Sequence, residues 1–154
     1  MLWRRPESAL VVIYDQLCRV LVLQRQDDSQ FWQSVTGTLE PGEQACTTAL
    51  REVLEETGID IVACAYTLVD QQKTNQYIIR KRWQHRYPPG TTSNTEHVFS
   101  VKVSGDDDIL LSEHTAFLWL SKTDAMAKVW SETNRQAIAD YVPDYLPDTY
   151  KGQP

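Results

Sequence analysis

The stretch from residue 37 to residue 59 holds the side chains best suited to do chemistry. Glu52, Glu55 and Glu56 follow one another at positions i, i+3 and i+4, which share one face of an α-helix. Carboxylates crowded this closely repel one another unless a positive charge joins them. Mg²⁺ prefers oxygen ligands and keeps several waters, so two or three carboxylates suffice to hold it. The spacing therefore predicts a divalent-cation site on the exposed face of a helix.

The same stretch has the other features of an amphipathic helix. Its apolar positions fall opposite the glutamates and are Cys46, Leu50, Val53 and Leu54. Pro41 and Gly42 precede the helix as a start signal. Gly58 follows its last turn, where a left-handed C-cap residue is favoured.

The spacing G-x5-E-x7-R-E-V-x-E-E-x-G-I resembles the Nudix box, whose defining positions are all matched here: Gly37, Glu43, Arg51, Glu52, Glu55, Glu56 and Gly58. Chance agreement at so many fixed positions is improbable, so an ordinary solvated helix face does not explain the run. The resemblance implies an α+β protein with the Nudix fold, a mixed β-sheet sandwiched between helices (α/β/α). It also implies Mg²⁺-dependent hydrolysis, with Mn²⁺ as a substitute, of a pyrophosphate bond in a nucleoside diphosphate linked to another group.

The box residues have distinct expected roles. Glu52 and Glu56, one turn apart, are the predicted metal ligands, and Glu55 beside them could ligate a second ion. Arg51 precedes Glu55 by four residues and could pair with it or with Glu43, which would orient the cluster. The three glutamates and Arg51 are therefore candidate catalytic residues.

A further carboxylate is expected from outside the box. Glu113 lies in a loop just before the apolar run 117–120, and in Nudix proteins a glutamate in this late loop commonly completes the metal site. Glu113 is therefore a candidate metal ligand and general base. The sequence does not choose between Glu113 and a box glutamate as the base. His85, His97 and His114 are expected to be structural.

A second resemblance covers nearly the whole chain. The segments RRPESALVVIY (4–14), VLVLQR (20–25), FWQSVTG (31–37), HRYPPG (85–90), NTE (94–96), EHTAFLWL (113–120) and NRQAI (134–138) together resemble the bacterial dihydroneopterin triphosphate pyrophosphohydrolases. This resemblance implies hydrolysis of 7,8-dihydroneopterin 3'-triphosphate to the monophosphate and pyrophosphate, an early step of folate biosynthesis.

The same resemblance implies substrate contacts from Arg4, Arg25, Thr36, Tyr77, Ile78, Ile79, Arg80 and Ser131. Arg4 and Arg25 can hold phosphate oxygens with planar, charge-assisted hydrogen bonds. Tyr77 could stack on a flat heterocycle, and Ser131 could bond a ring edge. Because family members vary along residues 77–80, contacts there could also come from the backbone alone. Gly37 would let the backbone approach closely, and its neighbour Thr36 could offer the ligand a donor.

The remaining elements position these residues. Apolar, β-branched runs at 8–14 and 18–25 predict a hairpin in a well-buried sheet. Further strands are expected at 61–69, 76–87, 95–103 and 117–120, and a second helix at 123–141. Residues 1–142 are expected to form one Nudix domain, and residues 143–154 a surface strap or a disordered tail.

Composition narrows the classes of function. The formal net charge of −6 argues against binding to a nucleic-acid backbone, in spite of the short basic run 80–87. The chain has no run long enough to span a membrane, and its three cysteines have no metal-ligand spacing. We expect no cleavable leader, because residues 1–7 are short and polar. We therefore expect a cytoplasmic protein. The resemblance implies an enzyme with a small pterin or nucleoside triphosphate as its partner, and we expect a monomer or weak homodimer.

Other activities remain open from the sequence. A general or housecleaning (d)NTP pyrophosphohydrolase, acting on dATP or 8-oxo-dGTP, is the nearest rival, because pterin and guanine present similar edges. Hydrolysis of dinucleoside polyphosphates also stays open, because Tyr77 lies near the position of a tyrosine found in that group of hydrolases. A catalytically silent Nudix domain would generally have lost box glutamates, and this chain has kept them all.

Overall fold

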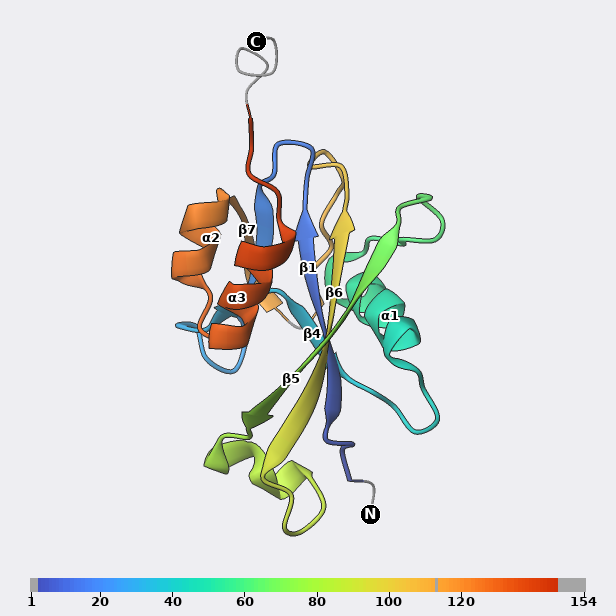
Figure 1. The fold of residues 1–154 in the computed structure, drawn as a ribbon, viewed down its shortest axis with the longest axis vertical. Helices are drawn as coiled ribbons and strands as arrows, with labels where there is room; N and C mark the ends of the chain where they lie inside the picture. The colour runs from blue at the N-terminus through green and yellow to red at the C-terminus, as the bar shows by residue number, and fades with distance from the viewer. Residues whose placement is uncertain (1–2, 113, 147–154) are drawn as a thin grey trace.

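The computed structural model describes residues 3–112 and 114–146, and it has three layers (Figure 1). Helix α1 (Ala45–Thr57) covers one face of a β-sheet, and helices α2 (Lys122–Lys128) and α3 (Glu132–Tyr141) cover the other. The predicted α+β class, with a mixed sheet between helices, is confirmed.

Within the described residues the sheet has seven strands: β1 (Glu7–Tyr14), β2 (Val20–Arg25), β3 (Trp32–Gln33), β4 (Val35–Thr38), β5 (Leu68–Ile78), β6 (Ser93–Lys102) and β7 (His114–Leu120). The sheet is mixed because β1 runs parallel to β6 and antiparallel to β2 and β4. Strand β1 therefore lies at the centre, next to the strand that leads into the box.

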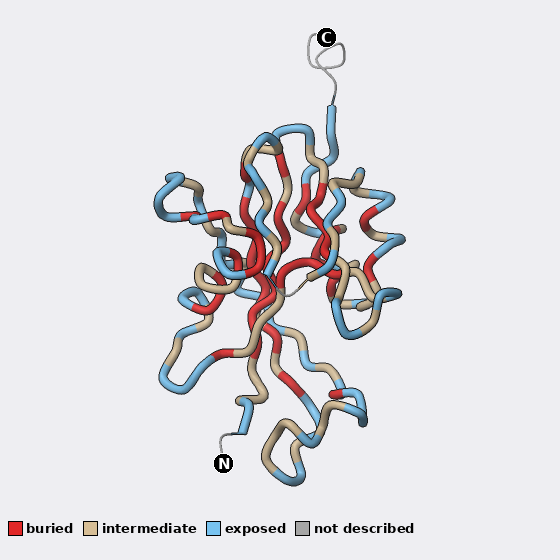
Figure 2. The backbone as a smooth tube through the Cα atoms, turned by 180° about the vertical axis from the view of Figure 1, so that it is seen from behind, coloured by how far each residue is buried: buried red, intermediate tan, exposed pale blue. Residues whose placement is uncertain are grey.

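The two faces of β1 enter two separate cores. Ala9, Val11 and Ile13 pack with residues of α1, whereas Leu10 and Val12 pack with residues of α2 and α3. Successive side chains of a strand point to opposite faces, so this continuous apolar run fits a strand covered on both sides. Figure 2 shows the buried residues gathered along the central strands.

The predicted hairpin of residues 8–25 is only partly correct. Strands β1 and β2 pair at Tyr14 and Val20, next to their connecting turn, and then separate. Strand β4 takes the place beside residues 8–11 of β1, and β7 pairs along β2. The apolar pattern identified both strands but carried no information about which neighbour each one would take.

Three further predictions were wrong in detail. Residues 61–65 form turns, with Ala65 at φ 60°, and the strand begins only at Leu68. The segment expected to be extended to residue 87 ends as a strand at Ile78, and Lys81–Arg86 forms the 3₁₀ helix η1. The second helix is split between α2 and α3, because Ser131 has an extended backbone and caps the start of α3.

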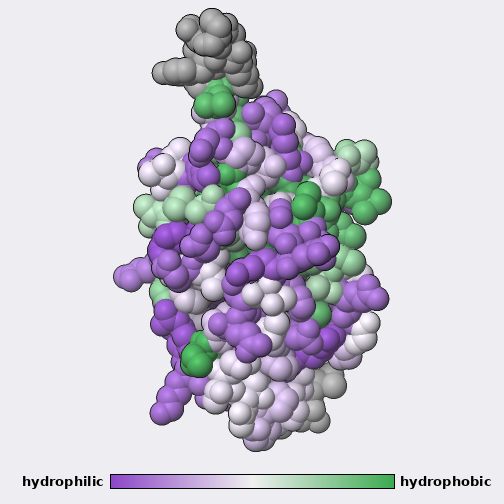
Figure 3. Space-filling model, viewed as in Figure 1, coloured by the Kyte–Doolittle hydropathy of each residue, from purple (hydrophilic) through white to green (hydrophobic). Residues whose placement is uncertain are grey.

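Strand β5 lies at the edge of the sheet, and its outer surface is polar. Its exposed positions include Asp70, Gln72, Lys73, Thr74 and Gln76, and hydrophilic side chains dominate this face of the molecule in Figure 3. The register shifts between Asp70 and Lys73, where Gln72 has φ 52°. A bulge and a lysine both discourage pairing with another strand.

Cys18, Cys46 and Cys64 are free, so no disulfide joins them. In the described part of the chain, none of the helices has the length and apolar character needed to cross a membrane.

Candidate active site

A cleft of about 1030 Å³ lies between the exposed face of α1 and the segments around η1 and the start of α3. It collects most of the predicted site residues: Arg4, Arg25, Thr36, Arg51, Glu52, Glu55, Glu56, Tyr77, Arg80 and Ser131. Ile78 and Ile79 do not line it: Ile78 is 74% exposed and Ile79 is buried. Glu113 lies outside the described residues.

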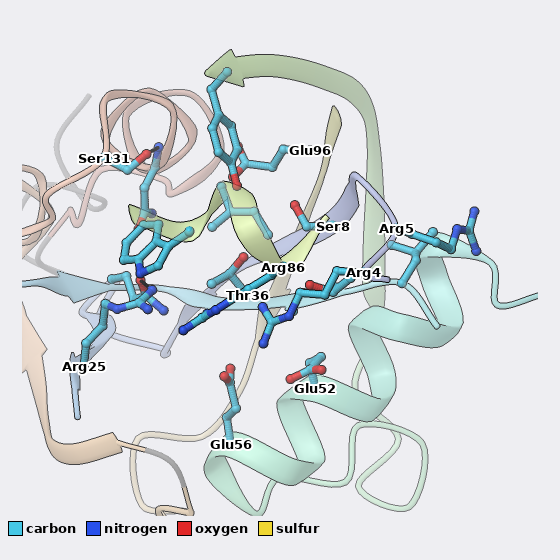
Figure 4. A pocket seen from close by; sticks show the side chains of 18 of the residues that line it. Arg4, Arg5, Ser8, Arg25, Thr36, Glu52, Glu56, Arg86, Glu96 and Ser131 are labelled. Carbon is cyan, nitrogen blue, oxygen red and sulfur yellow. Dashed lines mark hydrogen bonds between the residues drawn. The ribbon is translucent and has the colours of Figure 1, made fainter. Parts of the chain in front are cut away.

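The box glutamates form one wall of this cleft. Glu52 and Glu56 point from α1 into it (Figure 4), and Glu56 is almost completely buried. Glu55 lies farther out, with more than half of its side chain exposed. The predicted arrangement of carboxylates on one helix face is confirmed.

Gly37 makes room for Glu52. A Cβ atom added at Gly37 would lie 2.1 Å from Cδ of Glu52, well inside van der Waals contact. The close approach expected at this glycine is therefore made by a box glutamate of the protein itself. Strand β4, which carries Gly37, thus fixes where the Glu52 carboxylate can lie.

Arg51 joins the acidic residues of the box. It donates to both carboxylate oxygens of Glu43, at 2.9 and 2.8 Å, to Oε1 of Glu52 at 2.8 Å and to Oε2 of Glu55 at 3.3 Å. A further bond goes to the carbonyl of Thr38 at 3.2 Å. The hydrogen bonds from Arg51 lower the pKa of Glu43 to about 2. Both pairings proposed from the sequence, with Glu43 and with Glu55, are present.

The donor set suits a hard divalent cation. Glu52 and Glu56 offer carboxylate oxygens in the same cleft, and Mg²⁺ is commonly held by one or two carboxylates together with water and substrate phosphates. Within residues 3–112 and 114–146 no three potential ligands converge as a complete metal-binding group. The third ligand expected from the sequence, Glu113, lies outside those ranges.

Arginines lie between the two ends of the cleft. Figure 4 places Arg4 and Arg86 across its middle, with Arg25 to one side. Arg25 pairs with Asp27 through two contacts of 2.7 Å and donates to Oε1 of Gln33 at 3.2 Å. The Arg25 guanidinium also lowers the pKa of Asp27. A phosphate that binds Arg25 would therefore share it with a carboxylate.

Aromatic rings hold Arg25 and Arg80 in place. Arg25 lies over Trp83 at 4.8 Å, and Arg80 lies over Trp130 at 4.9 Å and over Phe31 at 5.0 Å. Phe31 and Trp130 are themselves stacked, with ring centroids 4.9 Å apart. The basic run 80–87 therefore folds beside the cleft, with Arg80 against rings from two distant segments.

The end of the cleft away from the box is polar and buried. The Tyr77 hydroxyl is hydrogen-bonded to Ser8, and burial, together with the nearby Glu96, raises the pKa of Tyr77 to about 12. Burial also raises the pKa of Glu96, which is 5% exposed. Ser131 accepts a hydrogen bond from the Asn134 backbone at 3.3 Å as the cap of α3. Ser131 thus has a structural role in addition to its place in the cleft.

Sequence reasoning missed several residues that line the cleft: Ser8, Trp83, Arg86, Glu96, His114 and Trp130. Burial, followed by the charge of Arg25, lowers the pKa of His114 to about 4, so this ring is neutral near pH 7.

For Glu96 the sequence did contain a signal of an unusual position. It alternates with Asn94 and Val98 at the buried positions of β6, where a charged side chain is unexpected.

The chain is similar to one family model and to several proteins of known name. The chain matches the family model for the NUDIX domain over residues 4–141. It is 49% identical to the dihydroneopterin triphosphate diphosphatase of Escherichia coli over 91% of this chain and 94% of that protein. It is 40% identical to the Haemophilus influenzae protein of the same name, over 92% and 90% of the two chains. The structure of the E. coli dihydroneopterin triphosphate pyrophosphohydrolase superposes with a TM-score of 0.87 at 48% identity, covering 92% of this chain and 98% of that one.

Proposed function

This chain belongs to the Nudix family, and we propose that it hydrolyses 7,8-dihydroneopterin 3'-triphosphate to dihydroneopterin monophosphate and pyrophosphate. The observation that carries the proposal is the 49% identity to the E. coli dihydroneopterin triphosphate diphosphatase over 91% of the chain. The cleft supports it, because carboxylates, arginines and a buried polar end follow one another along it. We assign the activity to a single domain of residues 1–142.

We propose that Glu52 and Glu56, together with Glu113 and with Glu55 for a second ion, hold a divalent cation. Enzymes of the Nudix family generally use such cations, and Mg²⁺ is the proposed ion, with Mn²⁺ as a substitute. When bound, the cation neutralises phosphate charge and makes a water molecule more acidic. Arg51 keeps the glutamates in place through its bonds to Glu43 and Glu52.

The arginines bind the phosphate chain in this proposal. Arg4 and Arg25 hold phosphate oxygens and stabilise the negative charge that develops on the departing pyrophosphate. Trp83 and Gln33 support this role, because they hold the Arg25 guanidinium in the cleft before substrate binds. A box glutamate or Glu113 takes the proton of the attacking water.

Thr36, Tyr77, Arg80 and Ser131 remain the proposed substrate contacts within the cleft. Contacts from Ile78 and Ile79 would have to come from the backbone, because neither residue lines the cleft. We also propose that the enzyme is cytoplasmic and that it works as a monomer or weak homodimer. Sedimentation of the purified protein would test the oligomeric state.

The deciding experiment compares triphosphate substrates. The purified protein with Mg²⁺ would be incubated with dihydroneopterin triphosphate, dATP and 8-oxo-dGTP, and kcat/KM measured by pyrophosphate release. We expect a preference for the pterin of about 100-fold or more, equivalent to about 2.7 kcal/mol. Comparable rates would instead identify a general (d)NTP pyrophosphohydrolase, and no pyrophosphate from any substrate would refute both activities.

A further inference from the structure

We propose that Glu96 recognises the heterocycle of the substrate, its carboxylate accepting hydrogen bonds from two adjacent N–H donors of a 2-amino-4-oxo ring. Pterin and guanine both carry such a pair, formed by the ring N–H and the neighbouring amino group. The inference rests on the proposed function in one respect, namely that the substrate is a triphosphate attached to a ring of this kind.

Burial of the carboxylate is the first observation. Glu96 is 5% exposed and lies in the wall of the cleft. Its hydrogen-bond donors in the protein are neutral: Asn75 Nδ2 reaches Oε1 at a long 3.4 Å, and the Thr133 side chain bonds it as well. A carboxylate has about four acceptor positions. These two bonds therefore leave acceptor capacity at a group that is costly to bury.

The charge of Glu96 is the second observation. No salt bridge within residues 3–112 and 114–146 joins Glu96 to an arginine, lysine or histidine. A buried carboxylate without a cation disfavours the binding of a polyanionic phosphate chain in the same cleft. Its presence there is explained if the ligand itself supplies donors to it.

The position of Glu96 is the third observation. In Figure 4, Glu52 and Glu56 lie at one end of the cleft, Arg4 and Arg86 across its middle, and Glu96 with Ser131 at the other end. A triphosphate whose phosphates lie against the glutamates and arginines directs its ring toward Glu96. Glu96 is thus placed for the ring, whereas Glu52 and Glu56 are placed for the cation.

The chemistry of the two partners sets the specificity. Two parallel N–H donors match the two oxygens of one carboxylate, and hydrogen bonds to a charged acceptor are about twice as strong as neutral ones. Inosine lacks the amino group and offers one donor of the pair. Adenine places an acceptor where guanine has its ring N–H, so it would face Glu96 with a repulsive contact.

The test compares wild type with Glu96→Gln on dihydroneopterin triphosphate, GTP, ITP and ATP, measuring kcat/KM for each. We expect wild type to prefer GTP over ITP by about 10-fold or more. In Glu96→Gln the values for the pterin and for GTP should fall by about 30-fold or more. The GTP-to-ITP ratio should then approach one, and the value for ATP should stay the same or rise, because the repulsive contact with the carboxylate is removed.

Glu132→Gln is the matched control. Glu132 also lines the cleft, but its side chain is 80% exposed and pairs with Arg135. This variant removes one negative charge from the rim and should keep the wild-type ratios. Thermal unfolding of both variants would verify that they are folded.

The outcomes separate the two proposals. If Glu96→Gln keeps the wild-type GTP-to-ITP ratio, or lowers all four values equally, Glu96 has only a structural role between Asn75 and Thr133, and the inference is wrong. If wild type shows no preference for the pterin over ATP, the proposed function is wrong. If wild type does not distinguish GTP from ITP, the inference fails even where the pterin is hydrolysed rapidly.

Discussion

Arg51 is the residue on which the arrangement of the box depends most directly. Its guanidinium contacts Glu43, Glu52 and Glu55 at once. An arginine with planar, always charged donors can bridge several carboxylates in this way, whereas a lysine offers only a compact point charge. The Arg51 guanidinium thus orders the acidic cluster without the help of a metal ion.

The pairing of Glu43 with Arg51 should make stability depend on pH in the acid range. The pKa of Glu43 is lowered from 4.5 to about 2, so its contribution is fully present above pH 4.5 and is lost as the pH falls from 4.5 toward 2. Glu43→Gln should therefore lose roughly 1–2 kcal/mol of unfolding free energy near pH 6 and almost none near pH 2. Urea unfolding at a series of pH values would measure this difference.

Glu40→Gln is the control for that series. The Glu40 side chain is 65% exposed and lies 3.8 Å from Arg51. Its variant should follow the wild-type curve within about 0.5 kcal/mol. A constant offset between Glu43→Gln and wild type at every pH would show that the loss has another cause.

Glu56 is expected to matter for turnover. Glu56→Gln removes a charge from a buried position in the cleft, and kcat should fall by at least ~10²-fold, as for the loss of a base or a metal ligand. Steady-state kinetics would be compared with thermal unfolding of the same sample. A folded Glu56→Gln protein with near-normal turnover would remove the box from the mechanism.

Gly37 gives a test of positioning without any change of charge. Gly37→Ala places a Cβ against Glu52, which should displace that carboxylate and lower kcat by about 10-fold or more. Gly90→Ala is a useful contrast, because a Cβ there meets nothing within 4 Å, although φ is 88°. Gly90→Ala should cost about 1 kcal/mol of stability and leave kcat unchanged. Equal kcat values for the two variants would contradict the role given to Gly37.

The sequence predicted the box residues well, because helical spacing alone places Glu52, Glu55 and Glu56 on one face. It did not predict Glu96 or Arg86, whose place in the cleft depends on which strands and segments become neighbours. For Tyr77 the sequence predicted the place in the cleft but not the hydrogen-bond partner. Its presence in the cleft agrees with the resemblance, but its bond to Ser8 joins residues distant in the sequence.

Among the elements, η1 departs most from the sequence prediction. An alternating basic and aromatic run was expected to be extended, yet Lys81–Arg86 is a 3₁₀ helix. Local pattern could not reveal this, because Arg80 and Arg82 both lie over Phe31, which belongs to a different segment of the chain. The tertiary contacts of the arginines outweigh the local preference of the run for strand.

Trp83 within η1 offers a test of this arrangement. It stacks with Arg25 at 4.8 Å, and loss of such a contact costs about 0.5–1 kcal/mol or more. Trp83→Ala should raise KM for the triphosphate by about 3- to 10-fold, with a smaller effect on kcat. Trp83→Phe keeps a ring under the guanidinium and should recover most of the affinity. A kcat defect without a change in KM would show that Trp83 does not act through binding.

At the scale of the whole molecule, α3 and Val142 close the second core, and the described residues beyond Val142 contribute little. Val142 is 2% exposed, whereas Tyr145 and Leu146 are 51% and 56% exposed. Lys122 pairs with Asp144 at 3.1 Å, but Asp144 is 84% exposed, and such surface pairs are worth about 0–1 kcal/mol.

A chain shortened to residues 1–144 should therefore keep activity within about twofold and Tm within about 3 °C of the full chain. A chain shortened to residues 1–140 loses Tyr141 and the buried Val142, and it should be less stable by about 2 kcal/mol or more. Equal stability of the two shortened proteins would contradict a domain boundary near residue 142.

The parallel pairing of β1 with β6 has a consequence for how the protein folds. Glu7 lies opposite Thr95 in this pair, so most of the chain, including α1, is a loop that must close before the central ladder can form. Closing so long a loop costs conformational entropy before the strand contacts that compensate for it can form, so this step is expected to be slow. Because Ala49 and Val53 of α1 belong to the same hydrophobic core as Phe99 and Val101 of β6 and residues of β1, the helix that carries the glutamates has no complete support until the ladder has formed. Catalytic competence should therefore appear late in refolding, in the same kinetic phase as the burial of the central strands.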